Sequence, residues 1–382
     1  MKTILVSAGE ISGDHYIACT ARALRQRGFD GGIVGLCGAE SRSAGIKEMW
    51  GNEALHLMGI SEVVRSVGSV LRLMGEMRRH IIDTMPDALL VADSPDFHLP
   101  LIRSVRRRGY KGKIFYVSPP SVWAWRRYRA RDLLRFVDVC FPLFAFEHEY
   151  LTNAGVVSRW AGHPLAEEFA DFSVSRSGVI KKIKGEPPGE SDVVAALLPG
   201  SRRSEIEPLY PVLSGLYTLL EKNGVKAVFS VAPGLSGRTR DFLTRALDKA
   251  GERYYEGLGR EIMGAADIVA GASGTATAEA LLLRRFMIVM YKVRPLSCVI
   301  GRLLLRGVKF AIPNLLAEEY FFPELIQGMA TPRNAYAEVR GWLDMDSRAR
   351  ENAMTRMDEL IQKMGSSGVY EFWAGDILGA MQ

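Results

Sequence analysis

The sequence predicts an α/β protein with two Rossmann-like, doubly wound domains, and three observations point to this architecture. The chain has 382 residues, a length that suits two domains with a core each. Short apolar runs alternate with helical stretches, the pattern of parallel sheets covered by helices. A polar segment rich in Lys, Gly and Pro, at residues 173–191, is the expected linker between two halves that repeat this pattern. We expect the two domains to face each other across a cleft, a common place for a ligand.

The first half, residues 1–172, is expected to form the first domain. A short apolar strand leads through a turn of small and polar residues into a helix at residues 15–27. The strands predicted in this half lie at residues 3–7, 32–35, 88–92 and 113–117. Because helical stretches separate them, these strands are expected to pair in parallel.

The second half, residues 192–346, starts the same pattern again. A strand at residues 193–198 leads through Pro199, Gly200 and Ser201 into a helix at residues 205–222. Further strands are predicted at residues 227–231, 268–271 and 287–291. Residues 347–382 are predicted to be helices that either cross back to the first domain or pair with a second subunit. Neither half contains G-x-G-x-x-G or G-x-x-x-x-G-K-[ST], which disfavours a dinucleotide dehydrogenase and a P-loop NTPase.

Composition describes a globular protein, with 48% hydrophobic and 24% charged residues. No run approaches the ~18 apolar residues of a membrane span, and the apolar start of the chain is too short for a signal peptide. The four cysteines are scattered, as is common in a reducing cytoplasm. The histidines and cysteines show no metal-type spacing, so we expect neither a metal nor a cofactor.

Positive charge is concentrated in one stretch of the chain. The net charge is +6, and residues 103–135 hold eleven Lys and Arg against one acid, Asp132. This stretch also contains tryptophans, a combination that suits a membrane interface as well as it suits RNA. Residues 59–82 mix apolar residues with arginines, which fits either an interfacial helix on lipid or an ordinary amphipathic core helix, the simpler interpretation.

Residues 267–285 form the most informative motif. After an apolar strand, Ser273, Gly274, Thr275 and Ala276 begin a helix, where small residues and free N–H groups favour an anion. Glu279 lies one helical turn beyond Thr275, so it is placed to accept hydrogen bonds from a sugar diol. A nucleoside diphosphate would fit this arrangement. A tight strand–helix connection with a solvated Glu279 is the alternative interpretation.

A second candidate anion site follows the strand at residues 193–198. Ser201 and Arg202 begin the next helix, and a guanidinium group there would stabilise negative charge on a departing diphosphate. The alternative is a helix cap with exposed arginines. The acid pair Asp344 and Asp346 resembles a metal–nucleotide motif, but it precedes a helix and is interpreted as a structural cap.

Acidic residues follow the predicted strand at residues 88–92. Asp93, Asp96 and His98 lie beyond its carboxyl end, where open α/β sheets place groups that contact ligands. Asp96 could take a proton from an attacking hydroxyl, with Asp93 or His98 tuning it. Ordinary turn chemistry explains the same residues equally well. Glu10, in the turn after the first strand, either is functional or complements the helix dipole.

Taken together, these residues closely resemble the lipid-A-disaccharide synthase family of inverting GT-B glycosyltransferases. The segments that carry the resemblance are residues 7–14, 57–60, 93–97, 116–119, 122–126, 162–164, 198–202, 273–279, 291–293, 313–317 and 323–325. The chain departs from the family pattern at Ile11, at Arg203 and at Arg285–Phe286, and residues 118–121 look one residue longer than usual.

The resemblance implies that 2,3-diacylglucosamine moves from UDP to 2,3-diacylglucosamine 1-phosphate with release of UDP. It makes Asp96 the base on the 6-hydroxyl of the acceptor, and it adds Glu10, Asp87 and Arg202 as catalytic residues. The implied UDP-sugar contacts are Ser201, Arg202, Arg260, Glu261, Ser273, Gly274, Thr275, Ala276, Glu279 and Asn314. The implied contacts of the acceptor and its lipid are Ser12, Asp93, Trp123, Trp125 and Arg126.

The resemblance also implies a cytoplasmic enzyme that is peripherally attached to the inner membrane and binds no nucleic acid. A homodimer is left open. The alternative enzymes are other UDP-sugar GT-B proteins, namely a peptidoglycan-type N-acetylglucosaminyltransferase or a UDP-sugar epimerase. A non-catalytic membrane-peripheral or RNA-binding protein that uses residues 103–135 is an alternative of a different class.

Overall fold

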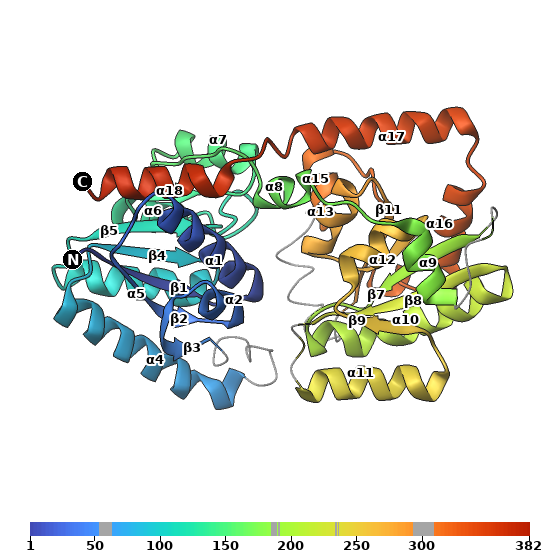
Figure 1. The fold of residues 1–382 in the computed structure, drawn as a ribbon, viewed down its shortest axis with the longest axis horizontal. Coiled ribbons are helices and arrows are strands. Elements are labelled where there is room, and N and C mark those ends of the chain that lie inside the picture. Colours follow the sequence, from blue (N-terminus) through green and yellow to red (C-terminus); the bar gives the residue numbers. More distant parts are fainter. Residues whose placement is uncertain (53–62, 185–188, 190–191, 234, 236, 293–308) are drawn as a thin grey trace. The chain divides into compact units, whose positions relative to one another are not determined.

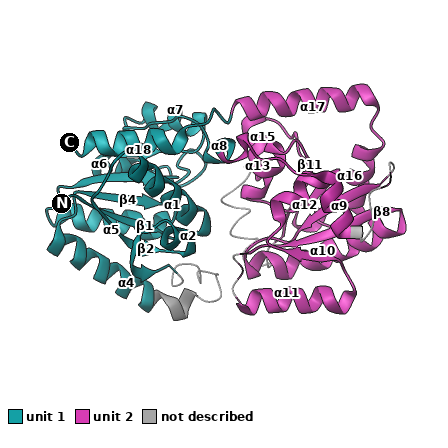
Figure 2. Cartoon of the chain, viewed as in Figure 1, with its two compact units in different colours: residues 1–167, 364–382 teal, residues 168–363 magenta. Residues whose placement is uncertain are grey.

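The chain forms two compact units, each built around its own sheet (Figures 1 and 2). The computed structural model describes residues 1–52, 63–184, 189, 192–233, 235, 237–292 and 309–382. Unit 1 consists of residues 1–167 and 364–382, and unit 2 consists of residues 168–363. Each described sheet has six strands, all paired in parallel, with helices on both faces. The predicted α/β fold class is confirmed.

The sheet of unit 1 has the strand order β3-β2-β1-β4-β5-β6. Its strands are β1 (Thr3–Ala8), β2 (Gly32–Cys37), β3 (Lys47–Gly51), β4 (Ala88–Ala92), β5 (Lys113–Val117) and β6 (Val139–Phe141). Its helices are α1 (Ile11–Gln26), α2 (Ala39–Ser43), α4 (Val63–Thr84), α5 (Pro95–Arg107), α6 (Arg129–Phe136), α7 (Ala145–Asn153), the start of α8 (Pro164–Ala170) and α18 (Val369–Ala380).

The sheet of unit 2 has the order β12-β11-β10-β7-β8-β9, which is the same topology counted from β7. Its strands are β7 (Val193–Leu198), β8 (Val225–Val231), β9 (Tyr254–Glu256), β10 (Ile268–Ala272), β11 (Phe286–Tyr291) and β12 (Glu324–Ile326). Its helices are α9 (Arg176–Lys184), α10 (Arg203–Lys222), α11 (Gly237–Ala250), α12 (Gly259–Ala265), α13 (Thr275–Leu282), α15 (Ile312–Ala317), the 3-10 helix η1 (Gln327–Met329), α16 (Pro332–Leu343) and α17 (Ser347–Gln362).

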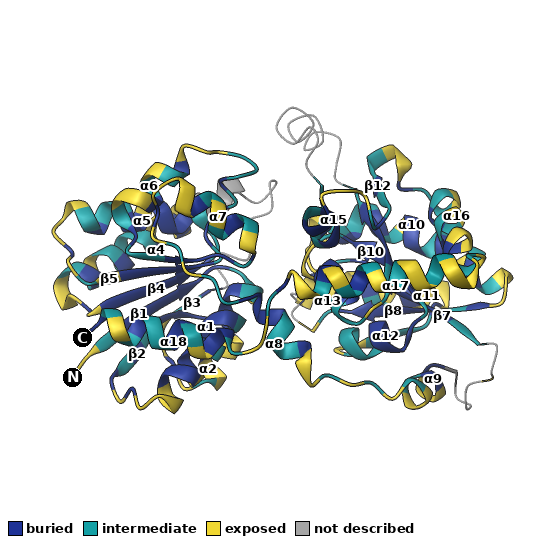
Figure 3. Cartoon of the chain, turned by 90° about the horizontal axis from the view of Figure 1, so that it is seen from above, coloured by how far each residue is buried: buried dark blue, intermediate teal, exposed yellow. Residues whose placement is uncertain are grey.

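The central strands are buried along their length (Figure 3). In β4 all five residues are buried, because helices cover both faces of the sheet and leave no polar side to the strand. Such uninterrupted apolar runs explain why the predicted limits of β4, β5 and β7 match the structure. Strands β3, β6, β9 and β12 were not predicted. Three of them have only three residues, which is too short for a recognisable pattern.

The carboxyl-terminal helices are divided between the two units. Helix α17 belongs to unit 2, and Asp346 caps it by accepting a hydrogen bond from the backbone N of Ala349 at 2.8 Å, which confirms the structural interpretation of that acid. Helix α18 belongs to unit 1 and packs along α1. Its fully buried Trp373 contacts Tyr16 and Phe141, with ring centroids 6.4 and 5.7 Å apart.

Two predicted segments also take definite positions. The predicted linker contains α9, where the Arg176 guanidinium donates to Asp267 at 2.8 Å within unit 2. Helix α4 places Val70, Leu73, Met77 and Ile81 in the core of unit 1, as an amphipathic core helix does. Residues 57–60 and 293, which carry part of the family resemblance, lie outside the described residues. Within the described residues, no helix combines the length and apolar character needed to cross a bilayer.

Candidate functional site

The strand order of unit 1 reverses between β1 and β4, which creates a place for a ligand at their carboxyl ends. The two strands are neighbours, and Ala8 at the end of one lies opposite Ala92 at the end of the other. The residues that follow these strands therefore lie side by side, at the starts of α1 and α5. Open parallel sheets bind their ligands at such a switch point.

Asp93 lies half-buried at this switch point, under the start of α1. Its carboxylate accepts hydrogen bonds from the backbone N of Gly9 at 3.1 Å and of Glu10 at 3.2 Å. Gly9 and Gly13 leave the space it occupies, because an added Cβ at Gly13 would lie 1.8 Å from its Oδ2. Burial raises the pKa of Asp93 to about 7, and the negative charge of Glu10 adds to the rise.

The backbone around Asp93 is strained and firmly held. Asp93 and Ser94 both have left-handed φ angles, of 53° and 38°, which non-glycine residues rarely adopt. The Asp93 carbonyl accepts hydrogen bonds from the Tyr116 hydroxyl at 2.6 Å and from His98 Nδ1 at 2.9 Å. Because that nitrogen must donate, His98 Nε2 accepts from the Ser7 hydroxyl at 2.8 Å. Burial lowers the pKa of His98 to about 4, so this imidazole is a neutral structural group.

Asp96, the proposed base, lies in the first turn of α5 and has a side chain that is 65% exposed. Its Oδ1 accepts hydrogen bonds from Arg126 at 2.7 Å and from the buried Arg129. Trp125 lies beneath the same two guanidinium groups, with the Arg126 Cζ 4.3 Å from its ring centroid. The structure therefore brings Asp96, Trp125 and Arg126 together.

The other predicted residues of unit 1 take different positions. Glu10 is the N-cap residue of α1 and Ser12 lies in its first turn, so both are at the switch point with Asp93. Trp123 donates its indole N–H to the buried Glu147 at 3.0 Å, an internal contact. Asp87 precedes β4 and so lies at the opposite, amino edge of the sheet, where it accepts from the backbone N of Thr3 at 2.7 Å. The structure does not bring Asp87 together with the others.

Unit 2 has an equivalent switch point, between β7 and β10. Leu198 and Gly271 pair there, and Gly271 is required because an added Cβ would lie 2.2 Å from the Leu198 carbonyl oxygen. Ser201 and Arg202 follow β7 and lead into α10. The Arg202 side chain is 58% exposed and contacts Glu205 at 3.6 Å, so its guanidinium group is accessible to solvent at the start of α10.

The start of α13 lies beside them. Gly274 and Thr275 are exposed, Ala276 is half-buried, and Gly274 has a φ of 137°, which favours glycine. Ser273 is tied down by its hydroxyl, which donates to the carbonyl of Phe310 at 2.7 Å. This helix start therefore offers backbone N–H groups to solvent. A small cavity at this edge is lined by Glu205, Leu209, Ala272, Ser273, Met290, Tyr291 and Lys292.

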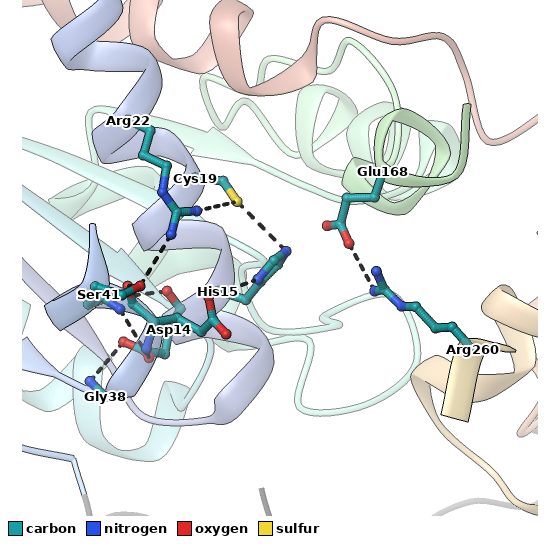
Figure 4. Close-up of polar contacts among 10 residues, drawn as sticks. Asp14, His15, Cys19, Arg22, Gly38, Ser41, Glu168 and Arg260 are labelled. Carbon is teal, nitrogen blue, oxygen red and sulfur yellow. Dashed lines mark hydrogen bonds and ion pairs between the residues drawn. The ribbon is translucent and has the colours of Figure 1, made fainter. Parts of the chain in front are cut away.

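Glu279 takes part in a partly exposed ion-pair cluster with Arg260 of α12. The Arg260 Nε donates to Glu279 Oε1 at 2.9 Å, and its second nitrogen donates to Glu168 Oε2 at 2.9 Å. Figure 4 shows the Arg260 and Glu168 side chains pointing toward one another. The Phe169 ring lies 4.8 Å from the Arg260 Cζ. Glu261 follows Arg260 in the first turn of α12 and is half-buried.

Asn314 is fully buried within unit 2, and its whole amide is used there. The Asn314 Nδ2 donates to the Phe322 carbonyl and to Glu324 Oε1, both at 2.8 Å, and its Oδ1 accepts from the backbone N of Phe322 at 2.7 Å. In unit 1, Asp14 is likewise structural, because its carboxylate accepts from the backbone N of Gly38, which precedes α2, and of Ser41 within α2 (Figure 4).

Sequence reasoning did not single out three residues that support these sites. Arg129 and Glu168 contact predicted residues that are 33 and 92 positions away in the chain, and Tyr116 holds the Asp93 carbonyl from a neighbouring strand. Nothing in the local sequence indicates such distant pairs. Among the described residues, no group of three or more His, Cys, Asp or Glu side chains is arranged to hold a metal ion.

The chain matches known proteins along almost its whole length. Residues 4–370 match the family described as lipid-A-disaccharide synthetase. The lipid-A-disaccharide synthase of Aeromonas hydrophila is 33% identical over 94% of this chain and 93% of its own length. That of Myxococcus xanthus is 33% identical over 96% of this chain and 94% of its own length.

Solved structures share the fold at much lower identity. The UDP-N-acetylglucosamine 2-epimerase of Methanocaldococcus jannaschii, in complex with UDP-GlcNAc and UDP, has a TM-score of 0.61 at 13% identity and covers 99% of this chain and 100% of its own. The same enzyme from Neisseria meningitidis, bound to UDP-GlcNAc, has a TM-score of 0.60 at 11% identity and covers 100% of this chain and 99% of its own. These likenesses concern the fold alone.

Proposed function

Because the chain belongs to the lipid-A-disaccharide synthetase family, it is a glycosyltransferase that forms the lipid A disaccharide, and we propose how its two switch points divide that reaction. The donor is UDP-2,3-diacylglucosamine and the acceptor is 2,3-diacylglucosamine 1-phosphate. One observation carries the proposal. At the carboxyl ends of its central strands, unit 1 has carboxylates. At the equivalent edge, unit 2 has a solvent-exposed helix start and an exposed guanidinium group.

Unit 2 binds the UDP of the donor. The exposed N–H groups at Gly274 and Thr275 receive the pyrophosphate, and Arg202 stabilises the charge that grows on the departing UDP. Ser201, Ser273 and Ala276 keep side chains small where the phosphates approach the backbone. Glu279 accepts hydrogen bonds from the ribose hydroxyls, held in place by Arg260. Glu261 contacts the donor sugar from the same turn of α12.

Unit 1 binds and activates the acceptor. Asp96 takes the proton of the 6-hydroxyl while that oxygen attacks the anomeric carbon of the donor from the face opposite UDP. The bond to UDP breaks as the new glycosidic bond forms, so the electron pair leaves with UDP and the anomeric configuration inverts. A positioned base of this kind contributes a factor of about 10²–10⁴ in rate.

The remaining predicted residues support these two events. Glu10, Ser12 and Asp93 shape the acceptor side of the switch point. Asp87 acts at a distance by fixing the start of β1 through Thr3. Asn314 likewise acts by holding the backbone between α15 and β12.

The acyl chains of both substrates require a lipid surface near unit 1. The stretch of residues 103–135 exposes Tyr128 and Leu134, with 61% and 54% of their surface accessible, beside its excess of arginines. Aromatic and basic side chains together suit the headgroup region of a membrane. We therefore propose peripheral attachment to the inner membrane through this stretch, in which Trp123 is held by Glu147 and Trp125 lies against Arg126. A homodimer stays a prediction.

One incubation tests the reaction. Purified protein is mixed with UDP-2,3-diacylglucosamine and 2,3-diacylglucosamine 1-phosphate in detergent micelles, and the products are weighed by mass spectrometry. We expect equal amounts of UDP and of a tetra-acylated disaccharide 1-phosphate. Conversion of UDP-GlcNAc to its 2-epimer, with no disaccharide from the lipid substrates, would instead support the epimerase alternative.

A further inference from the structure

Asp96 is contacted by two arginines, which bring more positive charge than is required to neutralise one carboxylate. Arg126 and Arg129 both donate to its Oδ1, so the cluster of these three groups carries a formal charge of +1. Neither bond uses the second carboxylate oxygen, Oδ2, on a side chain that is 65% exposed. If the only role of the cluster were to hold the Asp96 side chain in place, one guanidinium group would be enough.

The positions of the two arginines are also energetically unfavourable. Arg126 has a left-handed φ of 49°, a conformation that is strained for a residue other than glycine. Arg129 is buried, with 7% of its side chain exposed. Trp125 lies against both guanidinium groups, which keeps their planes fixed and excludes water from one side.

Most of the hydrogen-bonding capacity of these arginines is unused in the contact with Asp96. A guanidinium has five N–H donors in a rigid fork that matches a phosphate group, and each arginine gives one donor to Asp96. A phosphate monoester brings a charge of about −1.5 to −2, which the excess positive charge of the cluster would offset.

The chemistry of the acceptor supplies such a group at the right place. In a glucosamine 1-phosphate, C1 carries the phosphate and C5 carries the 6-hydroxymethyl group, and both carbons flank the ring oxygen. The phosphate and the 6-hydroxyl therefore lie along one edge of the sugar. A site that receives the hydroxyl at Asp96 must accommodate the phosphate close by.

We infer that Arg126 and Arg129 form the binding site for the anomeric phosphate of the acceptor, and that this contact delivers the 6-hydroxyl to Asp96 Oδ2. The inference rests on the proposed function and adds a rule of specificity to it. A phosphate monoester satisfies both guanidinium groups, whereas the phosphate attached to the sugar in the UDP donor is a diester with a single charge. The site thus selects the acceptor and rejects a second donor molecule.

The test compares two acceptors in variants of one arginine. R126Q keeps a polar side chain but removes its charge, and R129K keeps the charge but removes the planar fork. R42Q is the matched control, because Arg42 also pairs with a carboxylate, Glu48, at 3.0 Å and is 42% exposed against 37% for Arg126. The acceptors are 2,3-diacylglucosamine 1-phosphate and the same lipid with a free 1-hydroxyl.

We expect R126Q to raise the KM for the phosphorylated acceptor about 10- to 100-fold, in line with the loss of a charge-assisted hydrogen bond. Its kcat/KM for the acceptor with a free hydroxyl should fall by a factor about tenfold smaller, since with that lipid only the hydrogen bond from Arg126 to Asp96 is lost. R129K should change in the same direction. R42Q should match wild type with both acceptors.

Water-soluble glucosamine 1-phosphate gives an independent readout. It should inhibit wild type competitively against the acceptor, and this inhibition should be lost in R126Q, while UDP affinity stays the same in every variant. If R126Q slowed both acceptors equally, the arginines would serve Asp96 alone and the inference would be overturned. Failure of wild type to make any disaccharide would instead count against the proposed function. R126Q decides the matter even if R129K does not fold.

Discussion

The two units use the same sheet and connect their strands in the same order, yet the edges that carry the function differ in charge. In unit 1 the residues after β4 are Asp93 and Ser94, followed by Asp96 in the next helix. In unit 2 the residues after β10 are Ser273 and Gly274, with no charged side chain at the helix start. One edge therefore suits proton transfer and the other suits an anion.

This difference shows how a repeated scaffold can perform two tasks. The strand order fixes where a ligand can approach, because the loops diverge only at the switch point. The few residues that follow each central strand then decide what is bound. The contrast is chemical and local, so it can be tested by variants that affect one unit and leave the other unchanged.

The largest effect is expected at Asp96. D96N should lower kcat by about 10²–10⁴, because the amide cannot accept the proton of the acceptor hydroxyl. The affinity for UDP, which belongs to unit 2, should not change. Turnover and UDP binding are measured on the same preparation, by product mass and by calorimetry.

E371Q is the control for D96N. Glu371 is an exposed carboxylate of unit 1 that pairs with Arg27 at 3.6 Å, and its side chain is 62% exposed against 65% for Asp96. It should keep full activity. If D96N were nearly as active as wild type, the base would be another residue. The proposed role of the acidic edge of unit 1 in proton transfer would then be wrong.

Adjacent arginines in unit 2 give the next largest effect. R202A should weaken UDP binding about 10- to 100-fold and lower turnover, because a charge-assisted contact with the pyrophosphate is lost. R203A should leave both unchanged, since Arg203 pairs with Glu207 at 2.6 Å and stacks on Phe242. Equal losses in the two variants would indicate general electrostatic attraction in place of a specific site.

The raised pKa of Asp93 predicts that the stability of unit 1 depends on pH. Its pKa is about 7 in the folded chain and ordinarily about 3.8, so between these values the folded chain holds a proton that the unfolded chain has released. The free energy of unfolding therefore falls as pH rises through this window and levels off above about 7. Relative to D93N, wild type should lose about 2 kcal/mol between pH 5 and pH 8.

Urea unfolding followed by tryptophan fluorescence reports this effect. Five of the six tryptophans lie in unit 1, namely all except Trp342. A difference between wild type and D93N that does not change with pH would show that Asp93 is ionised throughout. D376N, on α18 of the same unit, serves as the carboxylate control.

The smallest effect is expected at Glu168. E168Q removes one of the two carboxylates that hold Arg260, while Glu279 keeps its own bond to that arginine. The KM for the UDP-sugar should rise only about three- to fivefold, with kcat unchanged, as for a partly exposed ion pair worth at most about 1 kcal/mol. E319Q, at an exposed pair with Arg356, is the control. A fall in kcat would mean that Arg260 takes part in the chemical step.

The sequence predicts the scaffold well because its signals are local. Buried parallel strands are continuous apolar runs, so the limits of β4 and β7 follow from their composition. The positions of Asp93 and Ser273 follow in turn from the rule that functional residues succeed such strands. The same rule separates Asp87, which precedes its strand, from the acids that follow it.

What the sequence does not predict are contacts between distant segments. Arg129 is one of eleven basic residues in its stretch, and only the fold identifies it as a buried partner of Asp96. His98 is adjacent to the predicted site in sequence, yet the turn of α5 directs it into the core, toward Ser7. Residues that are neighbours in sequence, such as Asp96 and His98, can therefore point in different directions at the start of a helix.

The position of α18 determines the order in which the protein can assemble during translation. The segment at residues 364–382 completes unit 1 but is synthesised after the whole of unit 2. Until it leaves the ribosome, the side of α1 around Tyr16 has no cover, and the nascent first unit presents that apolar strip to chaperones and to other chains. The unit that is begun first is therefore the one that is finished last.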